Sequence, residues 1–415
     1  MFLTQKGGFI MKPISKLLGA ILNLIYEGLS SLGVINIGFA IILVTVLIRL
    51  CMVPNMYKQK RTSTIINYIQ PEMNKIAKKY RNKKDQQSML AQQQETRELQ
   101  EKYGASMTGG CISSLIQLPI FMAMFNVIQN IPAYVHQVKN LYNPIAQAIA
   151  TDPVALEKFK TLHDNEKVLK SISFSKENTD TIIDVLSKFS QNTWDKFVDM
   201  FNGKGAVVDA INQNLSDIQD RYNFFGIDLT TAPGFALTIA LIIPILSFIF
   251  QYLSMHATPQ QTPSDPVQEQ TMKTMKTMLN VMPFMSLFIS ITAPAGLGLY
   301  WAMGSLLSFL TSISLNAYFK RTDVEKIVEK SKQKAAKKIA KRKAKGKKTF
   351  MERMQESANA GQNRNSAHVN SNLASTSLKN YTSNTMNNSS GTTKYKAGSL
   401  ASKANVMQRY NNDKK

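Results

Sequence analysis

Long apolar runs constrain this chain more than any other feature of its sequence. A helix needs about 20 mostly apolar residues to cross roughly 30 Å of hydrocarbon. Runs of about that length, separated by very polar stretches, lie at residues 34–53, 111–131, 234–254, 278–293 and 295–315. We therefore predict an all-α membrane protein, a bundle of five transmembrane helices.

The number of spans depends on how the last two runs are joined. They are separated only by Ala293-Pro294-Ala295-Gly296 and could form one long buried helix. Proline and glycine at the middle of such a segment favour a tight reversal of the chain. Five spans are therefore preferred over four.

Charge is distributed unevenly along the chain, whose formal net charge is +23. Segment 55–105 has 11 basic against 5 acidic residues, tail 320–415 has 23 against 6, and segment 134–232 has 10 against 13. Cytoplasmic loops of membrane proteins carry the excess of Lys and Arg. We expect a multi-pass protein of the plasma membrane with its N-terminus outside, its C-terminus in the cytoplasm and 134–232 outside.

Residues 1–33 precede the first span. Within them, 12–25 have a basic start and a short apolar stretch, as a signal peptide has. The apolar residues recur at helical spacing, however, with Lys16 and Asn23 on the other side. This pattern is typical of an amphipathic helix in the membrane interface. We see no convincing small-residue cleavage site and favour a retained interfacial segment.

The polar segments have patterns of their own. Segment 55–104 is predicted to be a cytoplasmic helical hairpin, which is either simply solvated or in contact with headgroups or an arriving partner. Apolar residues at i, i+3, i+4 and i+7 in 134–232 predict a small helical cap. The basic tail 321–415 should attract anionic lipids, and its composition predicts disorder after about 356.

Arg49 is the one charge well inside an apolar run. An arginine at the centre of a span costs about 2.5–3.5 kcal/mol and usually faces a partner or an aqueous cavity. Alternatively, its side chain could reach the helix exit near Pro54. No Asp or Glu lies in any predicted span. Arg49 among neutral polar groups is therefore consistent with a hydrophilic groove. Candidate polar residues in the spans are Gln117, Gln251, Tyr300, Trp301, Ser305 and Ser308.

No catalytic arrangement is recognisable. The four histidines, His136, His163, His256 and His368, are scattered without the spacing of metal ligands. No glycine-rich loop precedes a Lys-Ser/Thr pair, so nucleotide hydrolysis is not indicated. We expect no enzyme activity, no metal and no cofactor.

Several motifs in order resemble the YidC/Oxa/Alb family of membrane protein insertases. They span about 34–320, apart from the insert at 134–232. The matching stretches are Gly38 to Pro54, Gln70-Pro71, Tyr103-Gly104 through Phe121, Asp265-Pro266, Met282-Pro283 and Pro294 through Trp301. Ser113-Ser114 and Gly304-Ser305 depart from the family pattern, which leaves details of helix packing open.

The resemblance implies a bundle that encloses a hydrophilic groove and guides hydrophobic segments of nascent membrane proteins into the membrane without nucleotide hydrolysis. Arg49 matches the groove arginine, Thr45 and Gln117 match groove-side polar positions, and Trp301 matches the aromatic of the last span. Tyr300, Ser305 and Gln251 are further groove or packing candidates. The ribosome, through the basic tail, and the Sec translocon are the implied partners. The alternative function is a channel or secondary transporter, which would more often carry intramembrane carboxylates and repeated halves.

Overall fold

The computed structural model describes residues 4–81, 83, 85–105, 108–175, 178–257 and 266–344. The predicted disorder after about residue 356 lies outside these residues. Residues 1–337 form one compact unit, and the contacts described below lie within it.

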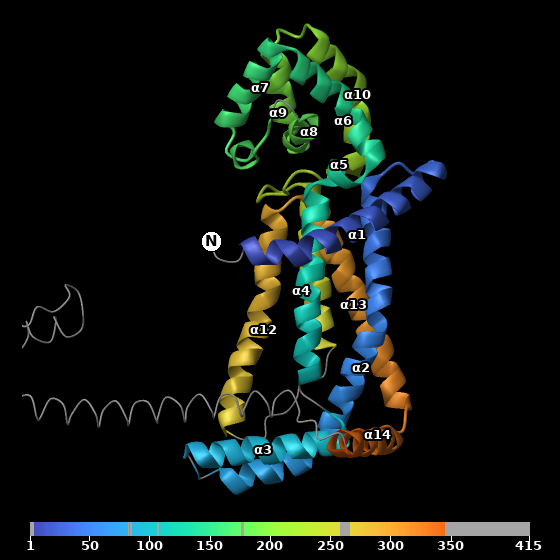
Figure 1. Cartoon of the computed structure of the whole chain (residues 1–415), viewed down its shortest axis with the longest axis vertical. Helices are drawn as coiled ribbons and strands as arrows, with labels where there is room; N and C mark the ends of the chain where they lie inside the picture. The colour runs from blue at the N-terminus through green and yellow to red at the C-terminus, as the bar shows by residue number, and fades with distance from the viewer. Residues whose placement is uncertain are drawn as a thin grey trace, which may run out of the picture. The chain divides into compact units, whose positions relative to one another are not determined.

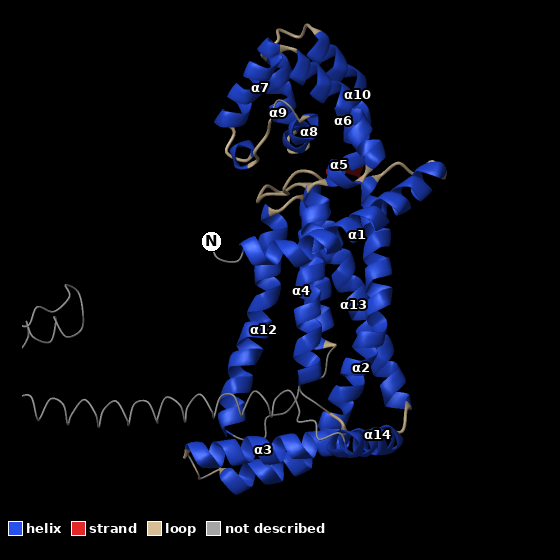
Figure 2. Ribbon diagram, viewed as in Figure 1, coloured by secondary structure: helices blue, strands red, loops and turns tan. Residues whose placement is uncertain are grey.

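Helices dominate the described chain, with one very short two-stranded sheet (Figures 1 and 2). The elements are α1 (Thr4–Ser31), α2 (Ile37–Tyr80), α3 (Gln86–Tyr103), α4 (Thr108–Gln129), α5 (Ile131–Tyr134), α6 (His136–Thr151), α7 (Pro153–Asn165), η1 (Leu169–Ser171), α8 (Thr179–Leu186), α9 (Gln191–Asp199), α10 (Ala206–Tyr222), β1 (Asn223–Phe224), β2 (Ile227–Asp228), η2 (Ile239–Leu241), α11 (Ile242–His256), α12 (Pro266–Thr292), α13 (Ala295–Arg321) and α14 (Val324–Ala344).

Three stretches among the described residues are long and apolar enough to cross a membrane: Ile37–Tyr80, Ile239–His256 and Ala295–Arg321. Two shorter apolar stretches, Gln117–Gln129 and Asn280–Thr292, belong to α4 and α12. Each of the five overlaps one of the apolar runs of the sequence. The prediction of an all-α membrane protein is therefore confirmed.

The apolar helices α2, α4, α11, α12 and α13 pack against one another. α13 contacts each of the other four, most extensively α11 and α2. Pro294 separates α12 from α13, so the last two apolar runs form separate helices. Residues 234–238, expected to begin the third span, are not helical. Their Gly234 has a φ of +66°, and its N–H donates to the Ile291 carbonyl at 3.0 Å at the end of α12.

Beyond the first span, α2 does not end at Pro54, where we expected the span to exit. It continues through Pro54 and Pro71 to Tyr80, because an internal proline removes one backbone hydrogen bond without necessarily ending a helix. The distal part of α2 then forms the predicted hairpin with α3. Asp85 caps α3 by accepting a hydrogen bond from the Ser88 N–H at 2.8 Å.

The hairpin has a small apolar core of its own. Ile65, Ile69 and Met73 of α2 are buried there. Val328 of α14 belongs to the same cluster, and Gly104 lies so close to Ser331 that an added Cβ would contact it at 2.9 Å. The first part of the basic tail is therefore a helix packed on the hairpin.

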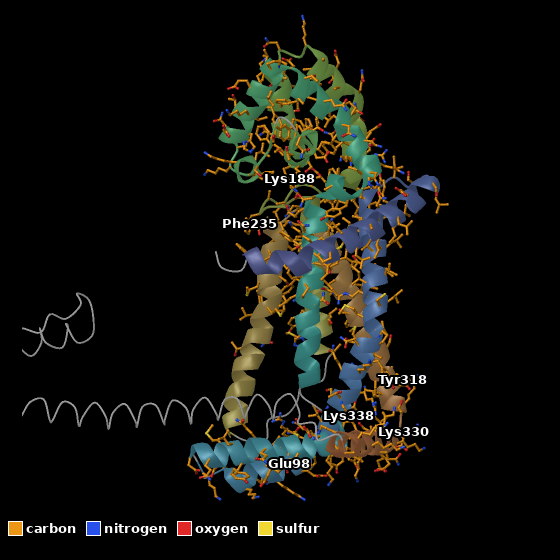
Figure 3. All side chains as sticks on the ribbon, in the orientation of Figure 1. Glu98, Lys188, Phe235, Tyr318, Lys330 and Lys338 are labelled. Carbon is orange, nitrogen blue, oxygen red and sulfur yellow. The ribbon has the colours of Figure 1, made fainter. Side chains whose placement is uncertain are left out.

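The insert 134–232 is the predicted helical cap, built from α6 to α10. Its core is aromatic: Phe159 and Phe197 are fully buried, and Phe189 and Trp194 pack beside them. Lys188, which is labelled in Figure 3, connects the insert to α4 because it donates a hydrogen bond to the Gln129 carbonyl at the end of that helix. α6 and α10 are paired extensively.

α1 joins the apolar helices to the insert. Leu18, Leu22 and Tyr26 are buried against α2 and α4, whereas Leu17 and Leu24 are exposed on another face. This two-sided pattern agrees with the amphipathic helix that the sequence predicted. Because α1 supplies core side chains, it is an integral part of the described fold.

Candidate functional site

Arg49 lies on α2, and its side chain extends sideways to α13. Its Nη1 donates a hydrogen bond to Ser308 Oγ at 2.9 Å. The guanidinium lies directly over Gly304, where an added Cβ would be 2.7 Å from Nη2. The absence of a side chain at Gly304 therefore makes room for the cation between the two helices.

One face of α13 lines this position. Tyr300, Gly304 and Ser308 are spaced four residues apart, so they lie on the same side of the helix. Tyr300 is buried, and Arg49 itself is half-buried. Among the ion pairs of the described residues, none includes Arg49. A cation shielded from water without a carboxylate partner attracts an anion more strongly than the same cation in water does.

Thr45 lies one turn before Arg49 and is fully buried. Its Oγ1 donates to the Ile41 carbonyl at 2.6 Å, within its own helix. The hydroxyl proton is therefore used locally, which leaves the oxygen of Thr45 as an acceptor only.

Trp301 of α13 and Gln117 of α4 lie near Phe121, an α4 residue that contacts α13. The Trp301 indole packs edge-to-face on Phe121 with ring centroids 5.1 Å apart, and Tyr300 lies 6.5 Å from the same ring. Gln117 is half-buried one turn before Phe121. No hydrogen bond between described residues joins Gln117 to Arg49 or Thr45.

Two further candidates lie apart from the Arg49 guanidinium. Gln251 of α11 accepts a hydrogen bond from Ser286 of α12 and so belongs to the contact between those helices. Ser305 is buried on α13, but the residue of that helix that accepts the hydrogen bond from Arg49 is Ser308.

The structure adds three residues to the site that the sequence had not assigned to it, Phe121, Gly304 and Ser308. Ser308 was noted only as a polar residue of the last span, and Phe121 only as part of a motif. The spacing of four between Tyr300, Gly304 and Ser308 was the available signal for Ser308. Which residue of that face would meet Arg49 depends on the register of α2 against α13.

Among the described residues, no group of three or more His, Cys, Asp or Glu side chains is close enough to hold a metal ion. His163, the buried histidine of the insert, instead contacts Asp164 and the Ile172 carbonyl, at 3.0 and 2.7 Å.

Comparison with known proteins assigns the family. The family model described as "60Kd inner membrane protein" matches residues 29–322, which include every candidate site residue. The chain belongs to the 60Kd inner membrane protein family. This assignment confirms the resemblance found from the sequence motifs.

Relatives of this family extend the match. "Membrane protein insertase MisCA" of Bacillus subtilis is 38% identical over 125 residues, 30% of this chain and 44% of that protein. "Membrane protein insertase YidC 1" of Lactiplantibacillus plantarum is 29% identical over 304 residues, 72% and 67% of the two chains. "Membrane protein insertase YidC" of Oceanobacillus iheyensis is 42% identical over 102 residues, 24% and 40%. The chain thus matches less than half of the length of the Bacillus subtilis and Oceanobacillus iheyensis proteins.

Proposed function

We propose that this chain is a membrane protein insertase that guides hydrophobic segments of nascent proteins into the plasma membrane. The observation that carries this proposal is Arg49, a half-buried cation between α2 and α13 with no carboxylate partner among the described residues. Membership of the 60Kd inner membrane protein family supports it, as do the names of the relatives, which are membrane protein insertases.

The proposed site is a hydrophilic groove between α2, α4 and α13, within a bundle of five spans. Arg49 attracts acidic or polar parts of the client segment that crosses the membrane. Tyr300 and Ser308 position its guanidinium, and the acceptor oxygen of Thr45 adds polarity one turn away. Gln117 and Trp301 form the α4 side of the groove, where Phe121 joins the two helices.

This groove works by shortening the hydrocarbon barrier that a polar tail must cross. Burial of the client's apolar span then drives insertion, at about 25 cal/mol for each Å² of apolar surface removed from water. Neither nucleotide hydrolysis nor a cofactor is required in this mechanism, and the protein is not an enzyme.

The proposed orientation places the N-terminus outside and the C-terminus in the cytoplasm. The hairpin of α2 and α3, with α14 packed on it, then faces the cytoplasm and receives clients. α14 has a dense basic surface (Lys330, Lys332, Lys334, Lys337 and Lys338 are all in its sequence). Anionic lipids, the ribosome and the Sec translocon are the partners proposed for this side.

Reconstitution tests the function directly. The full chain is placed in liposomes without other proteins, and a single-span client with a short N-terminal tail is added. Protease protection of the tail should be much greater than in empty liposomes. Equal protection in both would contradict insertion by this chain alone.

A further inference from the structure

The short β-hairpin of the insert has an unusual turn. β1 and β2 pair antiparallel, with Phe224 opposite Ile227, so Phe225 and Gly226 form a two-residue turn. Their φ values are +53° and +82°, which is the type I′ pattern. Asn-Gly is the preferred sequence for such turns, and a bulky residue at positive φ is strained. Phenylalanine is therefore a costly choice at position 225.

Packing within the chain does not account for this choice. The Phe225 side chain is 74% exposed, although it is one of the largest apolar side chains. Its aromatic neighbours are Phe224, with centroids 4.7 Å apart, and Phe39, at 6.1 Å. Strain that is not offset by burial suggests that the ring acts outside the chain.

The hairpin is fixed at the first turn of α2. Asn36, the N-cap of α2, accepts a hydrogen bond from the Gly38 N–H at 2.8 Å and donates to the Asn223 carbonyl at 2.7 Å. The Phe224 ring lies directly on Gly38, where any Cβ would collide with it. The position of Phe225 relative to the first span is therefore defined.

Phe225 continues an exposed apolar ridge of that span. Phe39, Leu43, Leu47 and Leu50 of α2 are all exposed and lie four, four and three residues apart, so they share one face. In a membrane helix such a face contacts lipid. Phe39 begins the ridge two residues after the start of α2, and its ring contact with Phe225 extends the ridge past the helix end.

We propose that the β1–β2 hairpin anchors the insert to the membrane, with the Phe225 ring in the interfacial region of the lipid bilayer. Phenylalanine, like Trp and Leu, is a side chain that interfacial elements bury at the boundary between headgroups and acyl chains. The proposal concerns the attachment of the insert to lipid. It requires that the chain is embedded in a membrane and does not depend on insertase activity.

Depth-dependent quenching tests this anchor. In the full chain with Cys51→Ser and Cys111→Ser, Phe225→Cys is labelled with an environment-sensitive fluorophore in phosphatidylcholine liposomes. Val154→Cys is the matched control, because Val154 is an exposed apolar residue of α7 in the same insert. The label at 225 should emit at shorter wavelength and be quenched by lipids with a nitroxide near the headgroup. The label at 154 should do neither.

Two results would overturn the proposal. Emission and quenching at 225 equal to those at 154 would place the ring in water. Apolar emission at 225 without quenching by the nitroxide lipids would indicate that protein, such as a second copy, covers the ring.

Phe225→Asn provides a second test, because the anchor and a ring without a partner predict opposite changes in amide hydrogen exchange. Asparagine tolerates positive φ, so this variant would steady the turn if the ring had no partner. If the ring is an anchor, amide hydrogen exchange over 222–230 in liposomes becomes several-fold faster in the variant. Unchanged or slower exchange would contradict the anchor.

Discussion

Two cations, Arg49 and Lys188, are both largely shielded from water by the chain. Arg49 donates a hydrogen bond to Ser308 and lies over Gly304 between α2 and α13. Lys188 is held by the Gln129 carbonyl at the C-terminal end of α4, where the helix dipole favours a positive charge. Burial nonetheless lowers the pKa of Lys188 to about 8, and the nearby Asp184 carboxylate opposes that shift.

The pH dependence of stability follows from this pKa. Unfolded lysine titrates near its ordinary value of about 10.4, so between about pH 8 and 10.4 the unfolded state binds more protons than the folded state. The free energy of unfolding therefore rises with pH across this window, by at most about 1.4 kcal/mol per pH unit. We predict that the melting temperature of the full chain in detergent rises from pH 8 to 10. Lys188→Met should flatten that rise.

Lys139→Met is the matched control. Half-buried Lys139 forms an ion pair with exposed Asp180 at 2.7 Å in the same part of the insert. Its loss should leave the pH dependence above pH 8 largely intact. A rise that persists in Lys188→Met would show that another group causes it.

For single residues, the sequence identified Arg49 as an unusual charge but did not predict which residues surround it. Arg49 stood out because charged residues are rare in spans. Gly304 appeared in the sequence only as a departure from a family motif. The structure explains the glycine, because a Cβ there would collide with the Arg49 guanidinium. Lys188 gave no signal, since it is one of nine lysines in segment 134–232 and belongs to no motif.

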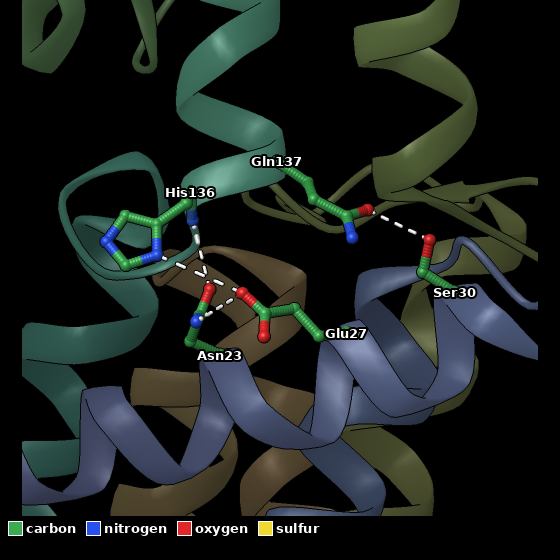
Figure 4. A network of polar contacts seen from close by, with 5 residues as sticks. All are labelled: Asn23, Glu27, Ser30, His136 and Gln137. Atoms are coloured by element: carbon green, nitrogen blue, oxygen red, sulfur yellow. Dashed lines mark hydrogen bonds and ion pairs between the residues drawn. The ribbon is translucent and has the colours of Figure 1, made fainter.

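Single elements connect distant parts of the chain, and α1 is the clearest case (Figure 4). Asn23 accepts a hydrogen bond from the His136 N–H at 3.0 Å, and its own amide donates to Glu27 at 2.7 Å. Ser30 donates to Gln137 at 2.9 Å. Since Val135 provides no side-chain cap, Asn23 satisfies the first N–H of α6 from another helix.

Asn23→Ala should therefore destabilise the attachment of the insert to α1. Loss of a cap hydrogen bond costs about 1 kcal/mol. We expect a lower melting temperature and faster proteolysis near 134–137. Ser31→Ala is the control, because Ser31 donates only to the Gly28 carbonyl within α1. Equal effects of both variants would argue against a stabilising role for the hydrogen bond from the His136 N–H to Asn23.

Helical periodicity predicted that the insert consists of helices. It did not predict that α2 would pass through Pro54, because the cost of an internal proline is decided by packing on both sides. Nor did it predict that residues 234–238, before α11, are not helical. The chain before α11 forms long-range hydrogen bonds instead, such as that from the Ala295 N–H to the Thr231 carbonyl at 2.8 Å.

For the whole molecule, the orientation in the membrane rests on charge distribution and stays a prediction. It can be tested with single cysteines after Cys51→Ser and Cys111→Ser. A membrane-impermeant maleimide added to intact cells should label Val154→Cys in the insert. Glu98→Cys in α3 (labelled in Figure 3) should react only after the membrane is opened. The reverse pattern would invert the topology.

The sequence predicted the features of the whole molecule that depend on composition and motif order. It did not predict those that depend on contacts between distant residues. The apolar runs identified a membrane protein, and the order of motifs identified its family. Composition contains no information on how the insert is attached. That attachment comes from α1, Lys188 and the β-hairpin, whose partners lie about 60 to 190 residues away in the sequence.

The central claim is that the Arg49 cation attracts acidic client tails, and matched clients test it most directly. Two single-span clients, one with an acidic and one with a neutral tail of equal length, are inserted into liposomes that contain wild type, Arg49→Lys or Arg49→Ala. The ratio of protected acidic to protected neutral tails should be high in wild type, largely kept by Lys and several-fold lower with Ala. An unchanged ratio in Arg49→Ala would contradict the claim.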